Sequence, residues 1–481
     1  MSIDEEQKRR RHRNERVVAF ALIALAAIAA WWILRVNRAT DEALRAETSY
    51  IPKPTTITPE VELLQQYIRF DTTNPPGNEL PAAQWLASLL ARGGVQAEVI
   101  ESAPSRASVY ARIEGRRRDE GLLLLHHIDV IGATPDGWKK PPFAAEIFLN
   151  QLYGRGAIDM KGVGICFLAG FLEVARSGRV PERDIVFLAV ADEETGSDLG
   201  MRWLMENRPD VIAGVRYALN EGGITEMQQE KMTYYGIEVG TKQSVTVELE
   251  AGNREALQRA RIALEPWFIS REAHRVLPEV RRFLADIAPQ RIEFRMDLED
   301  IDRTIANGRF WRLPAGYREV AQNLVWADGV VRAEDGFTMR TLLLNLPDEN
   351  PDQRLRWLES QVRPFGVRIG RIVRKEGPVP ISSTETPLYD LLRLEAERAY
   401  GARVGTEVLV KSFNDSRFLR TRGIAAYGIN PFPIDFFQSE SIHSTDERIR
   451  VDYFQQGVEF TRRLVAAFAF SEVTQSVSKP P

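Results

Sequence analysis

The stretch LLLLHHIDVIGATPDGW, residues 122–138, joins an apolar run to a cluster of polar side chains. Its leucines are typical of a strand that is buried on both faces of a sheet. His126, His127 and Asp129 follow directly, and a hydrophobic core disfavours such groups unless they are paired. In an open α/β sheet, ligands bind in the crevice beyond the carboxyl ends of the strands. The stretch therefore predicts a strand that carries polar groups to a functional site.

Strand-like and helix-like segments alternate on both sides of this stretch. We expect strands at residues 95–100, 184–190, 215–220 and 423–430, and helices at residues 163–178 and from Pro387. Residues 163–178 carry apolar side chains three and four positions apart, a spacing that places them on one face of a helix. Strands that are separated by helices predict an α/β domain with a mostly parallel sheet sandwiched between helices.

A different pattern interrupts this domain. Residues 244–267 are typical of a strand followed by a helix, and a strand, a helix and a strand are expected at 335–346, 350–362 and 367–375. We expect a smaller two-layer α+β insert at 238–373, which separates the main domain into a first part at 58–237 and a second part at 374–470, followed by a tail at 471–481.

The N-terminal region predicts a membrane anchor. Residues 17–34 are uncharged and apolar, and as a helix they span about 27 Å, close to the thickness of a hydrocarbon core. The basic residues before them favour a cytoplasmic N-terminus. We expect a cytoplasmic basic tail at 1–16, a single-pass transmembrane anchor at 17–36, a stalk at 37–57 and an extracytoplasmic main domain. The alternative is a cleaved signal peptide, but no small-x-small cleavage site follows the run.

Composition narrows the class of protein. With 481 residues, the chain is long enough for two domains that each bury an interior. The formal net charge of -4 gives no electrostatic reason to expect a nucleic acid partner. The single cysteine, Cys166, excludes an internal disulfide framework and a cluster of thiolate metal ligands. It lies on the apolar face of the helix expected at 163–178, so we expect it in the core.

Further polar residues follow the predicted strands or lie in the loops after them. They are Asp159 in YGRGAIDMKG, Glu193 and Glu194 in ADEETGS, Glu221 in NEGG, and His443 in the distant IHSTDERI. Each residue alone could cap a turn or lie in a solvated loop. Together, carboxylates that face one crevice would repel one another unless a cation neutralised them. Imidazoles with carboxylates suit zinc, with cobalt or manganese as alternatives.

These motifs resemble a family of di-zinc metallopeptidases. HIDV, DGW, YGRGAIDMKG, ADEETGS, NEGG, NDSR and HSTDERI occur in the order and roughly the spacing of this family (clan MH). Its members include aminoacylase, acetylornithine deacetylase, succinyl-diaminopimelate desuccinylase, bacterial glutamate carboxypeptidase and yeast Gly-X carboxypeptidase. The resemblance covers about residues 58–235 and 378–470. It implies a zinc-exopeptidase catalytic domain with the insert as a ferredoxin-like lid.

The resemblance also implies a role for each polar residue. His127 and Glu221 would bind one zinc ion, Glu194 and His443 would bind the other, and Asp159 would bridge the two. Asp129 would accept a hydrogen bond from His127 and so fix its tautomer. Glu193 would be the general base, which takes a proton from the attacking water and passes it to the leaving amine.

Two more residues are placed by the resemblance. Arg417 in NDSR matches a family arginine near the substrate carboxylate, a ligand that suits a guanidinium fork. His126 stands where the family usually has glycine. Because neighbouring side chains of a strand point to opposite faces, we expect His126 to pack inside the protein, away from the site of His127.

The insert departs from the family at two positions. The family's lid usually carries a histidine after its first strand, where it stabilises the oxyanion, but the chain has VELEAGNREAL at 247–257. Leu344 stands where the family's lid arginine is expected, and His274 is the only histidine of the insert. Losing an oxyanion donor typically costs about a hundred- to a thousandfold in rate. The departures leave substrate and efficiency open without weakening the case for metal binding.

Two hypotheses follow. The first is a membrane-anchored di-zinc hydrolase that cleaves the amide bond of a peptide or an N-acyl amino acid, as a carboxypeptidase, dipeptidase or deacylase does. The alternative is a metal-binding member of the family with an altered lid and weak or no catalysis, which acts as a binding protein. The complete ligand set and the retained base favour the enzyme. A monomer and a homodimer formed through the lid are both open.

Overall fold

The structure is a computed structural model that describes residues 56–228, 230–265, 275–408 and 413–471. They belong to one compact unit that begins at Thr56. The predicted basic tail, the anchor, the stalk up to residue 55, most of the C-terminal tail and His274 lie outside the described residues. In the part of the chain that is described, no helix is long and apolar enough to cross a membrane.

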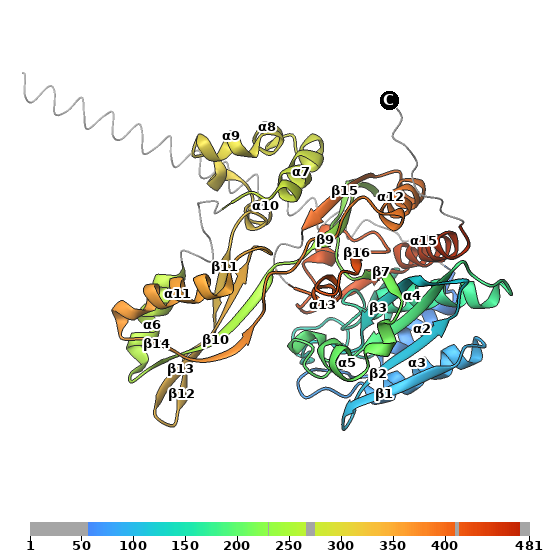
Figure 1. Cartoon of the computed structure of the whole chain (residues 1–481), viewed down its shortest axis with the longest axis horizontal. Coiled ribbons are helices and arrows are strands. Elements are labelled where there is room, and N and C mark those ends of the chain that lie inside the picture. Colours follow the sequence, from blue (N-terminus) through green and yellow to red (C-terminus); the bar gives the residue numbers. More distant parts are fainter. Residues whose placement is uncertain (1–55, 229, 266–274, 409–412, 472–481) are drawn as a thin grey trace, which may run out of the picture. The chain divides into compact units, whose positions relative to one another are not determined.

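A nine-stranded sheet forms the centre of this unit (Figure 1). In spatial order its strands are β1 (Ala97–Ala103), β2 (Arg106–Ile113), β6 (Arg183–Val190), β3 (Arg117–His127), β7 (Val215–Asn220), β16 (Ala425–Gly428), β9 (Lys231–Gly240) and β15 (Arg403–Val408), with β8 (Thr225–Gln228) beside β9. The four central strands β6, β3, β7 and β16 pair in parallel.

The prediction of a mostly parallel sheet is therefore right for the centre and wrong for the whole sheet, which is mixed. β2 pairs antiparallel with both β1 and β6, and β9 pairs antiparallel with both β8 and β16. Two of these antiparallel pairs follow from short connections, because strands joined by a short turn pair antiparallel whereas parallel neighbours need a long crossover. β1 and β2, like β8 and β9, are separated by only two residues.

The four leucines of β3 divide between the two faces of the sheet. Leu122 and Leu124 belong to the large core cluster, and Leu123 and Leu125 belong to a second cluster. The first cluster is covered by α2 (Pro59–Ile68), α3 (Leu80–Arg92), α4 (Lys161–Arg176), α12 (Pro387–Tyr400) and α15 (Val451–Phe470), and the second by α5 (Met201–Asn207) and α13 (Ser416–Arg420). The uninterrupted apolar run thus reflects burial on both faces.

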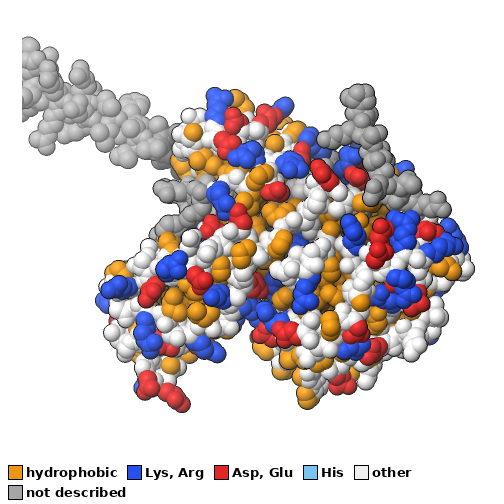
Figure 2. Space-filling view, viewed as in Figure 1, with side chains coloured by type: hydrophobic (Ala, Val, Ile, Leu, Met, Phe, Trp, Pro, Cys, Tyr) orange, Lys and Arg blue, Asp and Glu red, His pale blue; other side chains and the backbone are white. Residues whose placement is uncertain are grey.

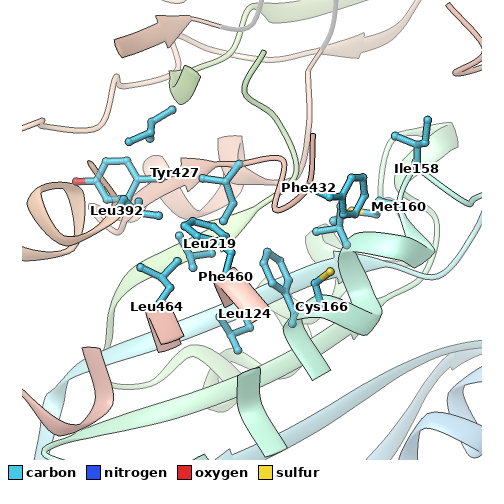
Figure 3. Close-up of a cluster of buried hydrophobic side chains, with 14 of the residues drawn as sticks. Leu124, Ile158, Met160, Cys166, Leu219, Leu392, Tyr427, Phe432, Phe460 and Leu464 are labelled. Carbon is cyan, nitrogen blue, oxygen red and sulfur yellow. The ribbon is translucent and has the colours of Figure 1, made fainter. Parts of the chain in front are cut away.

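Cys166 lies inside the large cluster, as the helical spacing predicts. Figure 3 shows it on α4 near Leu124 of β3 and Phe460 of α15. All three side chains are fully buried. The thiol is therefore part of the core, and burial raises its pKa well above the usual value.

A second, smaller sheet is built from the insert. Its strands are β11 (Leu324–Ala327), β13 (Gly336–Asn345), β10 (Gln243–Ala251) and β14 (Arg368–Lys375), all antiparallel, with β12 (Val331–Ala333) beside β13. The helices α6 (Arg254–Leu264) and α11 (Pro351–Val362) share its apolar cluster. The chain order is β-α-β-β-α-β, the order of a ferredoxin-like motif. We call this sheet with its two helices the lid.

The remaining part of the insert packs with the main domain rather than with the lid. It contains α7 (Pro278–Ile287), α8 (Arg295–Glu299), α9 (Ile301–Ala306) and α10 (Ala315–Glu319). Their buried apolar side chains belong to the large core cluster. The predicted insert at 238–373 therefore contributes side chains to two separate cores.

The visible surface carries charges of both signs. On the face that Figure 2 shows, positively and negatively charged side chains are interspersed.

Short elements complete the described chain. They are the three-stranded sheet of β4 (Ile147–Phe148), β5 (Gln151–Tyr153) and β17 (Arg448–Arg450), helix α14 (Phe436–Ser439), and 3-10 turns at Glu193–Thr195, Pro209–Ile212, Ala288–Gln290, Phe310–Arg312 and Arg363–Phe365. The pairing of β17 with β5 matters for the site, because it joins the chain just before Asp159 to the chain just after His443.

Candidate metal centre

Three neighbouring strands bring the predicted ligands together. His127 is the last residue of β3, Glu193 and Glu194 follow β6, and Glu221 follows β7. β6 and β7 flank β3 in the sheet and run parallel to it, so all three carboxyl ends open at one edge. The crevice predicted from the sequence is therefore the place where these side chains meet.

Asp159 lies between the two histidines. Its Oδ1 is 3.1 Å from Nε2 of His127, and its Oδ2 is 3.1 Å from Nε2 of His443. One carboxylate thus presents a separate oxygen to each imidazole. This is the arrangement expected of a ligand shared between two cations.

The two glutamates extend this arrangement to opposite sides. Oε2 of Glu221 lies 3.8 Å from Nε2 of His127, and Oε2 of Glu194 lies 3.3 Å from Nε2 of His443. Two sets of ligand atoms, each gathered within 4.8 Å, are compatible with a metal ion: His127 with Glu193 and Glu221, and His127 with Asp159 and Glu194. The geometry brings all five predicted ligands into one cluster.

The electrostatics of the cluster also fit cations. Hydrogen bonds to Asp159 and Glu194 raise the pKa of His443 to about 11. Burial, followed by the charge of Asp159, raises the pKa of Glu221 to about 7. Protons on the imidazole of His443 and on the carboxyl of Glu221 therefore compensate part of the negative charge of the cluster when only protons are available. Divalent cations would compensate the same charge and leave the nitrogens and oxygens as ligands.

Asp129 orients His127 through a different atom from the one expected. Nδ1 of His127 donates to the main-chain carbonyl of Asp129 at 2.8 Å, whereas the Asp129 carboxylate lies 3.6 Å away. This bond fixes the tautomer and leaves Nε2 free to face Asp159. The carboxylate of Asp129 instead accepts the main-chain N–H groups of Glu193 and Glu194, each at 3.1 Å. It therefore shapes the loop that carries both glutamates.

Two supporting residues were not singled out from the sequence. Glu447 is fully buried and accepts the main-chain N–H groups of Ile158 and Asp159 at 2.8 and 3.1 Å. Asn74 donates to the carboxylate of Asp129 at 2.8 Å. Glu447 stands in the quoted motif HSTDERI, so the motif held a signal. Asn74 lies in IRFDTTNPPGNE, a stretch that also resembles the opening helix and loop of the family, although the residue itself was not singled out.

One carboxylate oxygen of Glu193, Oε1, has no hydrogen-bond partner among the described residues. The side chain of Glu193 is 9% exposed, and Oε1 itself is buried. Burial raises the pKa of Glu193 well above its usual range. A buried carboxylate with one free oxygen is suited to accepting a proton from a reactant.

Arg417 is buried rather than open to a ligand. Its side chain is 2% exposed, and the aromatic rings of Phe413 and Phe418 lie 4.6 and 4.3 Å from the guanidinium carbon. Nε donates to Glu376 at 2.8 Å. In this conformation protein groups occupy the guanidinium, so the expected contact with a substrate carboxylate is not prepared here.

His126 packs inside the protein, as the alternation along β3 predicts. It is fully buried, and Nε2 lies 3.1 Å from the hydroxyl of Tyr67. Leu344, at the position of the expected lid arginine, is a buried residue of β13. The stretch 247–257 forms the end of β10 and the start of α6, with Asn253 capping that helix through its side chain.

Comparisons with known proteins show the family to which the chain belongs. Residues 123–467 match the description "Peptidase family M20/M25/M40". Aminoacylase-1A of Rattus norvegicus is 26% identical over 423 residues, which cover 85% of this chain and 95% of the relative. A probable succinyl-diaminopimelate desuccinylase of Staphylococcus aureus is 30% identical over 136 residues, or 28% of this chain. That second match spans only 33% of the relative's length.

The fold also agrees with a solved structure. An M20 family metallo-carboxypeptidase from Sulfolobus solfataricus superposes with a TM-score of 0.67 at 18% identity, over 86% of this chain and all of that one. At this identity the likeness shows the fold alone. The family match, by contrast, spans most of the chain and includes every predicted metal ligand. The chain therefore belongs to peptidase family M20/M25/M40.

Proposed function

We propose that this protein is a di-zinc hydrolase that cleaves the amide bond of a peptide or an N-acyl amino acid, as a carboxypeptidase, dipeptidase or deacylase. The observation that carries the proposal is the position of Asp159, with one carboxylate oxygen 3.1 Å from each of His127 and His443. A residue that only capped a helix would not need an imidazole on each oxygen.

The residues present fit two cations of this kind. His127 and Glu221 would hold one ion, Glu194 and His443 the other, and Asp159 both. Imidazole and carboxylate ligands without thiolate suit zinc, with cobalt or manganese as alternatives. Two such ions, when bound, would supply Lewis acidity and make a water more acidic.

The protein's own part in the reaction falls to Glu193 and to the groups that position it. Glu193 would accept the proton of the attacking water on its carboxylate and deliver it to the nitrogen of the leaving amine. Asp129 holds the loop of Glu193 through two main-chain N–H groups. Its main-chain carbonyl holds His127 at the same time. One residue therefore sets the base and a metal ligand relative to each other.

We infer the substrate class from the family and from the names of relatives. Aminoacylase-1A, succinyl-diaminopimelate desuccinylase and a metallo-carboxypeptidase all have names that refer to amide hydrolysis next to an amino acid. A free carboxylate on the substrate and a role of Arg417 in binding it remain proposals. So do the single-pass anchor at 17–36, the extracytoplasmic location of the catalytic domain and a homodimer formed through the lid.

A second candidate is a metal-binding protein with weak or no catalysis. It is favoured by one specific feature, the lid, which lacks the usual histidine at 247–257 and has Leu344 buried in β13 where an arginine is expected. Such a lid would lack the side chains that stabilise the oxyanion. The metal centre and Glu193 would be retained in either case.

A turnover experiment separates the two candidates. The full chain, purified in detergent and loaded with zinc or cobalt, is incubated with a panel of dipeptides and N-acyl amino acids, and the released amine is measured. Glu193→Gln, which keeps the shape of the side chain but cannot take up a proton, serves as the matched control. Amine release by the parent and not by the control supports the hydrolase. Two bound metal ions without release from any substrate support the binding protein.

A further inference from the structure

A single guanidinium connects the lid to the loop of the general base. Arg417 of α13 donates through Nε to Oε1 of Glu376 at 2.8 Å. Its Nη1 lies 3.8 Å from Oε1 of Glu193 and 3.7 Å from Oδ1 of Asp415, just beyond hydrogen-bond distance. Nη1 has no hydrogen-bond partner among the described residues. Three carboxylates therefore surround one buried cation, and only Glu376 bonds to it directly.

Glu376 stands where the chain leaves the lid. It follows directly on β14, and its Oε2 accepts both the main-chain N–H and the hydroxyl of Ser244, at 3.1 and 2.9 Å. Ser244 is the second residue of β10, where the chain enters the lid. The first entry of the chain into the lid, at β10, and its last exit, at β14, thus meet at this carboxylate; both strands are visible as long arrows in Figure 1.

The lid also contacts the same loop directly. Arg374 of β14 donates to the main-chain carbonyl of Thr195 at 3.1 Å. From the other side, Nη2 of Arg417 donates to the carbonyl of Gly196 at 3.3 Å. Gly196 has a φ of +109°, and an added Cβ would lie 1.5 Å from Arg374 Nη1. The loop that carries Glu193 is therefore enclosed between a lid arginine and a main-domain arginine.

We propose that Glu376 is a positioning residue for the general base: it holds Arg417 Nη1 at 3.8 Å from Glu193, short of a hydrogen bond, and ties the placement of that base to the seating of the lid strand. The inference rests on the proposed function. Without the Glu376 charge, the buried guanidinium has Glu193 and Asp415 as its nearest carboxylates. A direct hydrogen bond from Nη1 would then engage Oε1 of Glu193 and turn that carboxylate away from the attacking water.

The closing experiment uses the full chain in detergent with both metals bound. Glu376→Gln keeps the side-chain shape and an acceptor oxygen but removes the charge that holds Arg417. We expect kcat to fall by about 10- to 100-fold, the range caused by misplacing a catalytic group by about 1 Å. Two metal ions per chain should remain bound. The control Glu248→Gln removes a carboxylate of similar chemistry, paired with Arg371 on the lid surface, and should leave kcat unchanged.

A second comparison distinguishes positioning from a general loss of structure. In a Glu193→Asp background the base is already withdrawn by one methylene, so Glu376→Gln should then lower kcat by less than about threefold. Equal fold-changes in both backgrounds would indicate a merely structural role and overturn the proposal. If Glu376→Gln folds poorly, Ser244→Ala removes one hydrogen bond to Glu376 and should shift kcat in the same direction by a smaller factor.

The outcomes also separate this inference from the function on which it rests. A parent that releases amine, with Glu376→Gln at full kcat, overturns the positioning role alone. A parent that hydrolyses no substrate of the panel overturns both. A fall in kcat that is accompanied by loss of bound metal would show that Glu376 supports the metal ligands instead of the base, and would likewise overturn the proposal.

Discussion

The carboxylate of Asp129 accepts the main-chain N–H of Glu193 at 3.1 Å. The sequence motif HIDV suggested that this carboxylate would hold the imidazole of His127. The main-chain carbonyl of Asp129 makes that contact instead, at 2.8 Å. The side chain is therefore free to act on the loop after β6, and a substitution that alters only the side chain should affect the base more than the histidine.

Asp129→Asn tests this division of labour. The substitution keeps the main-chain carbonyl that orients His127, but an amide cannot accept two N–H groups with two oxygens, and its NH2 would face donors. Turnover should fall by about 10- to 100-fold, the usual effect of losing a group that orients an active site. Metal content, measured by elemental analysis, should stay at two ions per chain. A variant that loses bound metal but keeps the turnover of the parent would contradict the assignment.

Glu193 and Glu194 should separate into a base and a ligand. Glu193→Gln should keep both metal ions and lose most turnover, because an amide cannot take up the proton. Glu194→Gln should lose affinity for one metal ion first, because it replaces an anionic oxygen 3.3 Å from Nε2 of His443. Metal content and rate are measured side by side for each variant. The reverse pattern would show that the two roles are exchanged.

The two metal positions should differ in how readily a chelator reaches them. The side chain of His443 is 52% exposed, whereas that of His127 is 2% exposed. A chelator should therefore remove the ion held by His443 first and the ion held by His127 more slowly. His443→Ala should bind one ion, and Asp159→Ala should bind fewer than two with lowered affinity for both. A single phase of release with equal rates for both ions would contradict this asymmetry.

Much of the site could be predicted because its polar residues stand at the carboxyl ends of buried strands. His127 ends one such strand and Glu194 and Glu221 follow two others, and parallel strands present their carboxyl ends at one edge. Which atom of Asp129 contacts His127 could not be predicted, because it depends on the path of the chain after β3. The burial of Arg417 depends on Glu376, 41 residues away in sequence and on another part of the fold.

The fold shows the same division. An uninterrupted apolar run predicted the strand β3, and apolar side chains at helical spacing predicted the helix α4. The antiparallel partners β1, β2 and β8 were not predicted as such, because pairing direction is set by connection length and by neighbours in space. The apolar side chains of α7 to α10 could pack equally well against the lid or against the main domain. The sequence of these helices therefore did not reveal that they join the large core cluster.

The predicted anchor should decide where the protein partitions. Residues 17–36 should hold the full chain in the membrane fraction after washing with high salt and carbonate, and detergent should release it. A chain that begins at Thr56, the start of the compact unit, should stay in the supernatant. Protease added to intact cells should reach the catalytic domain if the N-terminus is cytoplasmic. Full protection of that domain would contradict the predicted topology.

The buried His126 should make the stability of the unit fall in mild acid. Burial, followed by the charge of His127, lowers the pKa of His126 from the model-peptide value of 6.5 to about 3. Between these values the unfolded state binds a proton that the folded state does not, so the free energy of unfolding decreases as pH falls. The slope for one such group reaches about 1.4 kcal/mol per pH unit. Above pH 6.5 the contribution to stability is constant.

His126→Gln removes this titration while keeping an acceptor near the hydroxyl of Tyr67. Urea unfolding of parent and variant chains that begin at Thr56, both stripped of metal, is compared from pH 7.5 down to pH 4. The variant should be less stable near pH 7, because glutamine does not reproduce the shape of the imidazole in a tightly packed position. The ring lies so close to Gly164 that a Cβ added there would be 2.4 Å from it. The difference between the two free energies of unfolding should shrink as pH falls below 6.5, since only the parent contains a histidine at this position that resists protonation. A difference that stays constant over the whole range would show that His126 becomes protonated as easily in the folded chain as in the unfolded one.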